Sequence, residues 1–246
     1  MNRVRALVFA ASATAALAAW WYSAELPTPE LRAIRAAEIC GFLATVCLYL
    51  ALVASPLYAA FPGLPSRAAH LSARRALGVS CFAFALAHTW ISFFDLLAGW
   101  RGIDFLTRAH LDDLLRSTAA LLILGLLAFT STDWALARLG HGWKLLHRLV
   151  YVAALLVLVH LYAVGSHYVG GATAASVATV LLVGLLVTLE GNRIDAWMVR
   201  RFGEAYRLGL GFALGVSLAV AAAAYVLGGS GNPLSVHGAH PPVQAK

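Results

Sequence analysis

The sequence has few charged residues for its length. Only 12% of its 246 residues are Asp, Glu, Lys or Arg, whereas 61% are hydrophobic and the mean hydropathy is +0.78. Soluble globular domains carry about 25% charged residues. The shortage of charge therefore excludes a water-soluble globular domain and indicates a chain that lies in a lipid bilayer.

Cysteine is also scarce. The sequence contains three cysteines, Cys40, Cys47 and Cys81, all in hydrophobic runs, and no two of them form a C-x-x-C pair. This pattern excludes a disulfide framework and does not suggest a thiolate metal site. We therefore expect the three side chains to be small core residues.

Long hydrophobic runs follow one another along the chain, separated by short polar stretches. A helix needs about 20 mainly apolar residues to cross the hydrocarbon core of a bilayer. The expected spans are residues 6–21, 39–61, 76–97, 114–130, 145–164, 174–189 and 208–227. Backbone N–H and C=O groups must be paired inside the membrane, and the period-two alternation of barrel strands is absent. The sequence therefore predicts an all-α, polytopic transmembrane helix bundle.

The distribution of basic residues predicts the orientation. An N-terminus in the cytoplasm places most of the 18 Lys and Arg residues on the cytoplasmic side, as the positive-inside rule requires. With seven spans the C-terminus is then periplasmic, and we expect a multi-pass protein of the bacterial inner membrane. The net charge of +7 comes from helix ends and not from one basic face, so membrane lipid is an expected partner and nucleic acid is not.

The first hydrophobic run has two interpretations. Arg3 and Arg5 before an apolar stretch resemble a secretory signal, and cleavage would leave six spans with the same topology. Trp20, Trp21 and Tyr22 favour a retained helix, because aromatic side chains anchor the ends of spans at the membrane interface. We expect the helix to be retained.

Two of the nine histidines lie deep in expected spans. His88 is about 18 Å and His160 about 24 Å from the cytoplasmic end of its span, at 1.5 Å per residue, and the two spans run in the same direction. An ionisable side chain at this depth is a functional candidate, and neutral imidazole is a usual ligand of haem iron. We predict that His88 and His160 hold one b-type haem. The alternative is two buried histidines that are hydrogen-bonded across helices.

His147 lies near the cytoplasmic end of the fifth span. It precedes His160 by a rise of about 20 Å, which would suit a second haem, but the two side chains lie about 140° apart on an ideal helix. A bulge or kink would be needed to align them, and Arg74 and Arg75 occupy the level where a partner histidine would lie. Two interpretations stay open: an inner haem ligand with an unidentified sixth ligand, or a residue that contacts the edge of a flavin or haem.

Basic side chains near these levels are candidate partners of anionic haem propionates. The candidates are Arg74, Arg75, Lys144 and Arg148 on the cytoplasmic side and Arg101 on the outer side. Snorkelling to the interface is the more common role of each such side chain taken singly. The remaining histidines are expected in loops or outside the membrane: His70, His110, His141, His167, His237 and His240.

Several ordered motifs resemble a known family. They are RRALG at 74–78, LAFTST at 127–132 and WKLLHRLVY at 143–151, together with His88 and His160. This order is similar to the ferric-reductase-like transmembrane domain, in particular to the haem-binding subunit of the periplasmic methionine sulfoxide reductase system (MsrQ type).

The resemblance implies a six-helix core, residues 1–200, that holds one or two b haems, with His88, His147 and His160 at the family's haem-histidine positions. It also implies electrons that arrive from a cytoplasmic flavin reductase or from quinol. The electrons would then pass to a periplasmic redox partner, a molybdenum-cofactor enzyme that repairs oxidised methionine. FMN is a further cofactor attached to this branch. Residues 201–230 would add a C-terminal transmembrane helix, and residues 231–246 a flexible external tail.

The second span departs from the family pattern. It begins EICGF at 38–42, where the MsrQ type has Gly-x-x-Ala-Leu, which leaves the specific partner open. Three functions remain: an electron-transfer subunit that is not a stand-alone catalyst, a terminal ferric or oxygen reductase, and a non-redox transporter or assembly subunit. The sequence contains no dinucleotide-binding domain, so we expect a separate electron donor and favour the first function.

Overall fold

The protein is a bundle of long helices. The computed structural model describes residues 3–164 and 174–228, and within these ranges it contains helices and no strand. The elements are α1 Arg3–Ala24, α2 Pro29–Ala60, α3 Arg67–Trp90, η1 Ile91–Leu96, α4 Trp100–Ile103, α5 Arg108–Phe129, α6 Asp133–Leu139, α7 His141–Leu146, α8 Leu149–Val164, α10 Ala174–Phe202, η2 Glu204–Tyr206 and α11 Leu210–Gly228. The predicted all-α class is confirmed. The expected tail at 231–246, and His167, His237 and His240, lie outside the described residues.

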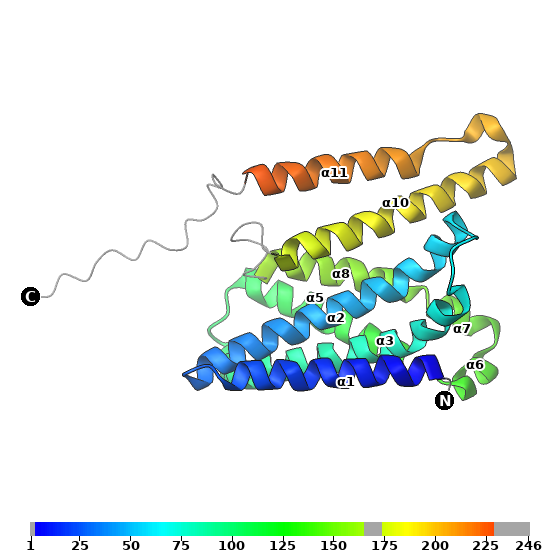
Figure 1. Cartoon of the computed structure of the whole chain (residues 1–246). Helices are drawn as coiled ribbons and strands as arrows, with labels where there is room; N and C mark the ends of the chain where they lie inside the picture. Colours follow the sequence, from blue (N-terminus) through cyan, green and yellow to red (C-terminus); the bar gives the residue numbers. More distant parts are fainter. Residues whose placement is uncertain (1–2, 165–173, 229–246) are drawn as a thin grey trace, which may run out of the picture.

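The long helices lie roughly side by side, with α1 and α11 at opposite edges of the bundle (Figure 1). Among the described helices, five are long and apolar enough to cross a membrane singly, or six if α5 and α6, which are bent by 93°, form one span. The chain is therefore a multi-pass membrane protein. Helix α11 occupies the region of the expected seventh span and lies alongside α10 (Figure 1), and its crossing of the membrane stays a prediction.

Several helices begin earlier than the hydrophobic runs predict. Helix α2 starts at Pro29 and not at residue 39, because the Thr28 side chain caps it by accepting a hydrogen bond from Leu31 N and proline suits the first helical position. Helix α3 starts at Arg67 and not at residue 76. The prediction that three histidines lie in loops is therefore wrong. The structure places them in helices α3, α5 and α7: His70, His110 and His141 respectively.

Helix α2 is at the centre of the bundle. Leu48 and Tyr49 are almost fully buried, and the Tyr49 hydroxyl donates to the Ala154 carbonyl of α8 at 3.2 Å. The surrounding cluster takes residues from α3, α5, α8 and α10: Cys81, Phe84, Leu124, Ala153, Leu186 and Leu189. The three cysteines are free, and Cys47 and Cys81 belong to this core. Close packing of this kind, rather than exclusion of water, stabilises helices against one another in a bilayer.

Two interruptions of regular helix lie near candidate residues. Helix α3 passes directly into the π-helix η1 at Ile91, three residues after His88. Helices α7 and α8 are separated by His147 and Arg148, which lie between Leu146 and Leu149. Such interruptions re-aim side chains, and π-helical turns are frequent at functional sites.

Candidate functional site

The structure brings His88 and His160 together. His88 comes from α3 and His160 from α8, and their ring centroids are 6.0 Å apart with an angle of 76° between the ring planes. Two ionisable rings at this depth, facing each other across helices, form the candidate site.

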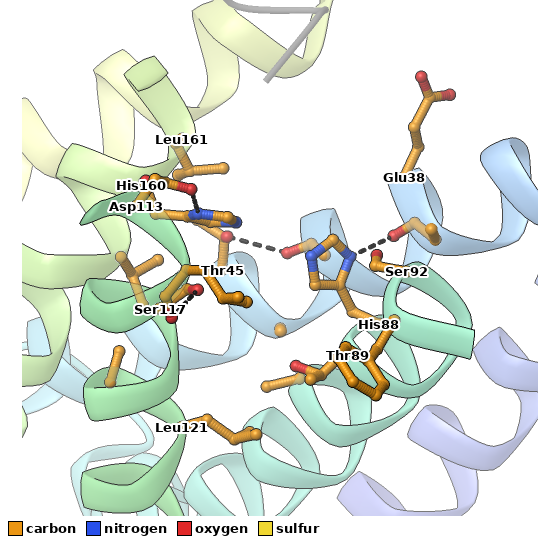
Figure 2. A pocket seen from close by; sticks show the side chains of 18 of the residues that line it. Glu38, Thr45, His88, Thr89, Ser92, Asp113, Ser117, Leu121, His160 and Leu161 are labelled. Carbon is orange, nitrogen blue, oxygen red and sulfur yellow. Dashed lines mark hydrogen bonds and ion pairs between the residues drawn. The ribbon is translucent and has the colours of Figure 1, made fainter. Parts of the chain in front are cut away.

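Each ring of the pair is held by a hydrogen bond at Nδ1. His88 Nδ1 lies 2.9 Å from the Ala37 carbonyl oxygen, and His160 Nδ1 lies 2.8 Å from Asp113 Oδ2. A carbonyl or carboxylate oxygen only accepts, so each Nδ1 donates the bond, and in a neutral ring the lone pair is then on Nε2. Figure 2 shows His160 bonded to Asp113, with the ring of His88 across the pocket from it. This is how metal-binding histidines are oriented by their second-shell partners.

The pair lines a cavity of about 580 Å³ between α2, α3, α5 and α8. Most of its wall is apolar and includes Phe42, Leu48, Ala85, Leu121, Leu124 and Val157. Gly41 of α2 also lines the cavity, and a Cβ there would lie 3.1 Å from His88 Nδ1, closer than an ordinary van der Waals contact. A mainly apolar cavity of this size with a few convergent polar groups is typical of a cofactor site.

The geometry of the pair fits a haem. Metal–imidazole bonds are about 2 Å long, so two rings on opposite sides of one metal ion have their centroids about 6 Å apart, and the observed separation is 6.0 Å. The described residues contain no group of three or more His, Cys, Asp or Glu side chains suited to a bare metal ion. Two facing imidazoles are instead the donor set of a metal that brings its own equatorial ligands, as haem does.

His147 does not join this cavity. Its ring is stacked on Trp143, with centroids 3.8 Å apart and planes at 25°, and its Nε2 lies 3.2 Å from the Thr130 hydroxyl. That hydroxyl already donates to the Leu126 carbonyl at 2.7 Å, so His147 Nε2 is the donor of the shared bond. The protein itself therefore occupies Nε2 of His147.

The candidate propionate partners also lie outside the lining of the cavity. Arg74 donates to the Ala51 carbonyl at 3.1 Å. Arg75 forms an ion pair with Asp133 and lies 5.5 Å from the centroid of the Trp143 ring. The other three candidates have exposed side chains: Arg101 in α4, Lys144 in α7 and Arg148 after α7. The geometry joins Arg75 to His147 through Trp143 and leaves the role of all four guanidinium groups toward a cofactor as a prediction.

Sequence reasoning missed Asp113, which lies one residue before the expected span at 114–130. Asp113 is 5% exposed and belongs to the fourth expected membrane helix, α5, which begins earlier than its hydrophobic run. The signal was present in the spacing, because Asp113, Ser117, Ala120 and Leu124 recur every three or four residues and all line the cavity. Gly41 and the Ala37 carbonyl carried no comparable signal.

Comparison with known proteins gives matches over this region. The family of ferric reductase like transmembrane components matches residues 40–158, which include His88 and Asp113 and end two residues before His160. No solved structure is significantly similar to the chain.

Three relatives named protein-methionine-sulfoxide reductase heme-binding subunit MsrQ are similar to the chain. The relative from Bordetella parapertussis is 32% identical over 170 residues, which cover 65% of this chain and 74% of that protein. The one from Yersinia enterocolitica is 34% identical over 147 residues, covering 57% and 66%. The one from Agrobacterium fabrum is 32% identical over 124 residues, covering 49% and 53%.

Proposed function

We propose, from the premise that the chain belongs to the ferric reductase like transmembrane family and is a membrane haem electron-transfer subunit, that it carries electrons from the cytoplasmic to the periplasmic side of the inner membrane. The donor is a cytoplasmic flavin reductase or quinol. The acceptor is a periplasmic redox enzyme, so the chain is one subunit of an oxidoreductase system and does not itself catalyse a reaction on a substrate.

The observation that carries this proposal is the facing pair of His88 and His160. The two residues would bind b haem as axial ligands from α3 and α8, and the apolar wall of the cavity would exclude water from it. When bound, the haem supplies reversible one-electron chemistry. Ala37 and Asp113 hold the two rings in the orientation that presents Nε2 to the cofactor.

His147 is the candidate for a second cofactor contact. A second haem, or FMN, would bind at the end of the bundle formed by α6 and α7, where Arg74, Arg75 and Arg148 supply positive charge for propionate or phosphate groups. His147 would have to give up its hydrogen bond to Thr130 to become a ligand. Arg101 would serve propionates at the other end of the bundle.

The orientation and the partner follow from charge and from the relatives. The N-terminal end of α1 lies at the same end of the bundle as α6 and α7 (Figure 1), and the excess of basic residues there favours the cytoplasm. The names of the relatives assign them to protein-methionine-sulfoxide reductase. We therefore propose a molybdenum-cofactor methionine sulfoxide reductase as the periplasmic acceptor.

Residues 1–200 form the haem domain in this proposal, and residues 201–230 add a helix that docks on another subunit.

The test is the absorption spectrum of the purified full-length protein, oxidised and dithionite-reduced, with haem quantified per polypeptide. The wild type is expected to show a six-coordinate b-type spectrum. His88→Ala and His160→Ala should each lose it, because one imidazole alone does not complete the site. His141→Ala, in an exposed position of α7, is the matched control and should keep it. A wild-type protein without haem would instead favour a transporter or assembly subunit.

Reoxidation of the reduced, purified protein distinguishes an electron-transfer subunit from a terminal reductase. Reduced protein that is reoxidised by the methionine sulfoxide reductase and not by ferric chelates supports the proposal. Rapid reoxidation by ferric chelates or oxygen alone would favour a terminal ferric or oxygen reductase.

A further inference from the structure

The two rings of the histidine pair have acceptors of different charge. His88 donates to the neutral Ala37 carbonyl at 2.9 Å, whereas His160 donates to the carboxyl group of Asp113 at 2.8 Å. Hydrogen bonds to an ionised acceptor are roughly twice as strong as those between neutral groups. The two imidazoles are therefore chemically unequal, although both belong to the same residue type.

Asp113 is placed so that its charge acts on His160. Its side chain is buried, and its second oxygen, Oδ1, has no hydrogen-bond partner among the described residues. In the described part of the chain its ion-pair partner is His160, with no Lys or Arg within 4.0 Å. Because the side chain is buried, solvent screens this carboxylate weakly, and its field falls on the imidazole beside it (Figure 2).

A carboxylate behind an axial imidazole changes the metal as well as the ring. Second-shell carboxylates fix the orientation of a ligating histidine and raise its basicity. A more basic ligand and a nearby negative charge both stabilise ferric iron relative to ferrous iron, and second-shell hydrogen bonding is one of the means by which proteins set a haem potential.

We propose that Asp113 is a positioning residue that makes His160 the stronger electron-donating ligand of the pair and lowers the reduction potential of the haem between them. The inference rests on the proposed haem site. The step concerned is the addition of one electron to ferric iron to give ferrous iron, and no bond to the protein is made or broken. The electron comes from the cytoplasmic donor.

A purely structural role for Asp113 makes a different prediction. In that case the carboxylate only ties α5 to α8, and any group that keeps the hydrogen bond would serve equally well. Asp113→Asn separates the two, because the amide has nearly the same size and keeps an acceptor oxygen for His160 Nδ1 but carries no charge.

The experiment is a redox titration of the purified full-length haem protein, with Asp113→Asn, Asp113→Glu and a matched control. Asp112→Asn is that control, since it removes the same charge from the adjacent, exposed position of α5. At a fixed ambient potential we expect Asp113→Asn to raise the ferrous-to-ferric ratio about tenfold. This is equivalent to a rise of about 59 mV in the reduction potential of a one-electron couple. Asp113→Glu should stay near the wild type, and Asp112→Asn should match it.

Two results would overturn the proposal. One is an Asp113→Asn protein that keeps its two-imidazole spectrum and has an unchanged potential. The other is an equal shift in Asp112→Asn, which would make the effect one of net charge and not of contact with His160. Both differ from failure of the proposed function, in which the wild type itself binds no haem.

A measurement on the wild type covers the case in which Asp113→Asn loses its haem. In protein labelled with ¹³C at the aspartate carboxyl carbon, infrared difference spectra of the reduced and oxidised states separate aspartate bands from those of propionates. We expect reduction to shift an aspartate band that Asp112→Asn retains. No aspartate band responding to reduction would overturn the proposal.

Discussion

The histidine pair of α3 and α8 and the single His147 differ in which ring nitrogen the protein occupies. In the pair, the protein binds both Nδ1 atoms and leaves both Nε2 atoms at a cavity. At His147 the protein binds Nε2 through Thr130 and covers the ring face with Trp143. The difference teaches that sequence position alone does not prepare a histidine for this cavity: a hydrogen-bond partner must occupy Nδ1 so that Nε2 is the nitrogen presented to it.

The largest expected effect tests this difference between the histidine pair and His147 directly. His160→Ala should remove nearly all haem, whereas His147→Ala should retain the haem of the α3–α8 pair, since the first change deletes a prepared ligand and the second a ring outside the lining of that cavity. Haem per polypeptide, measured on purified protein, checks the prediction. Equal loss in both variants would show that His147 is needed for the same cofactor.

A smaller effect is expected at Gly41. Gly41→Ala adds a methyl group 3.1 Å from His88 Nδ1 and should displace the ring, weakening haem retention and the two-imidazole spectrum. Gly78→Ala is the matched control in α3, where a Cβ meets nothing within 4 Å. Both changes favour helix formation by about 1 kcal/mol, so a difference between them reports the contact with His88. Equal haem retention in the two variants would contradict this account.

Trp143→Leu should affect stability more than the haem pair. It removes the stacking on His147, worth about 0.5–1.5 kcal/mol, and the hydrogen bond from Trp143 Nε1 to the Thr130 carbonyl, worth about 1 kcal/mol. Thermal unfolding in detergent checks this loss, with Trp134→Leu, an exposed tryptophan of α6, as the control. A changed spectrum of the α3–α8 haem in Trp143→Leu would mean that the two regions are coupled.

The smallest effect is expected for Arg75→Gln. The variant loses an ion pair with the exposed Asp133 and a contact with the Trp143 ring, and such surface interactions contribute up to about 1 kcal/mol each. Unfolding should therefore shift only slightly relative to Arg138→Gln. A large loss of cofactor in Arg75→Gln would instead assign this guanidinium to propionate or phosphate binding.

The helical class and the depth of the pair could be predicted from the sequence. Hydropathy indicates which runs lie in lipid, and the fixed rise of a helix converts the positions of His88 and His160 into comparable depths. The same geometry required a kink only if His147 and His160 both held haem, which stays a prediction; the structure shows α7 and α8 as separate helices on either side of His147 and Arg148.

The partners of the pair could not be predicted in the same way. Asp112 and Asp113 are adjacent acids in α5, which begins after the Thr107 cap, and the packing of that helix leaves Asp112 exposed and turns Asp113 to the cavity. The Ala37 carbonyl and the small size of Gly41 matter because α2 approaches α3 closely there, and helix approach is a property of the packed bundle. The stack of Trp143 on His147 has the same origin.

The central claim is that His88 and His160 are the two axial ligands of one haem, and the electron paramagnetic resonance spectrum of the ferric full-length protein tests it most directly. Two imidazoles with planes far from parallel, 76° apart in this structure, predict a highly anisotropic low-spin signal that disappears in His88→Ala and in His160→Ala. A high-spin signal in the wild type, or a low-spin signal that survives either substitution, would contradict the account.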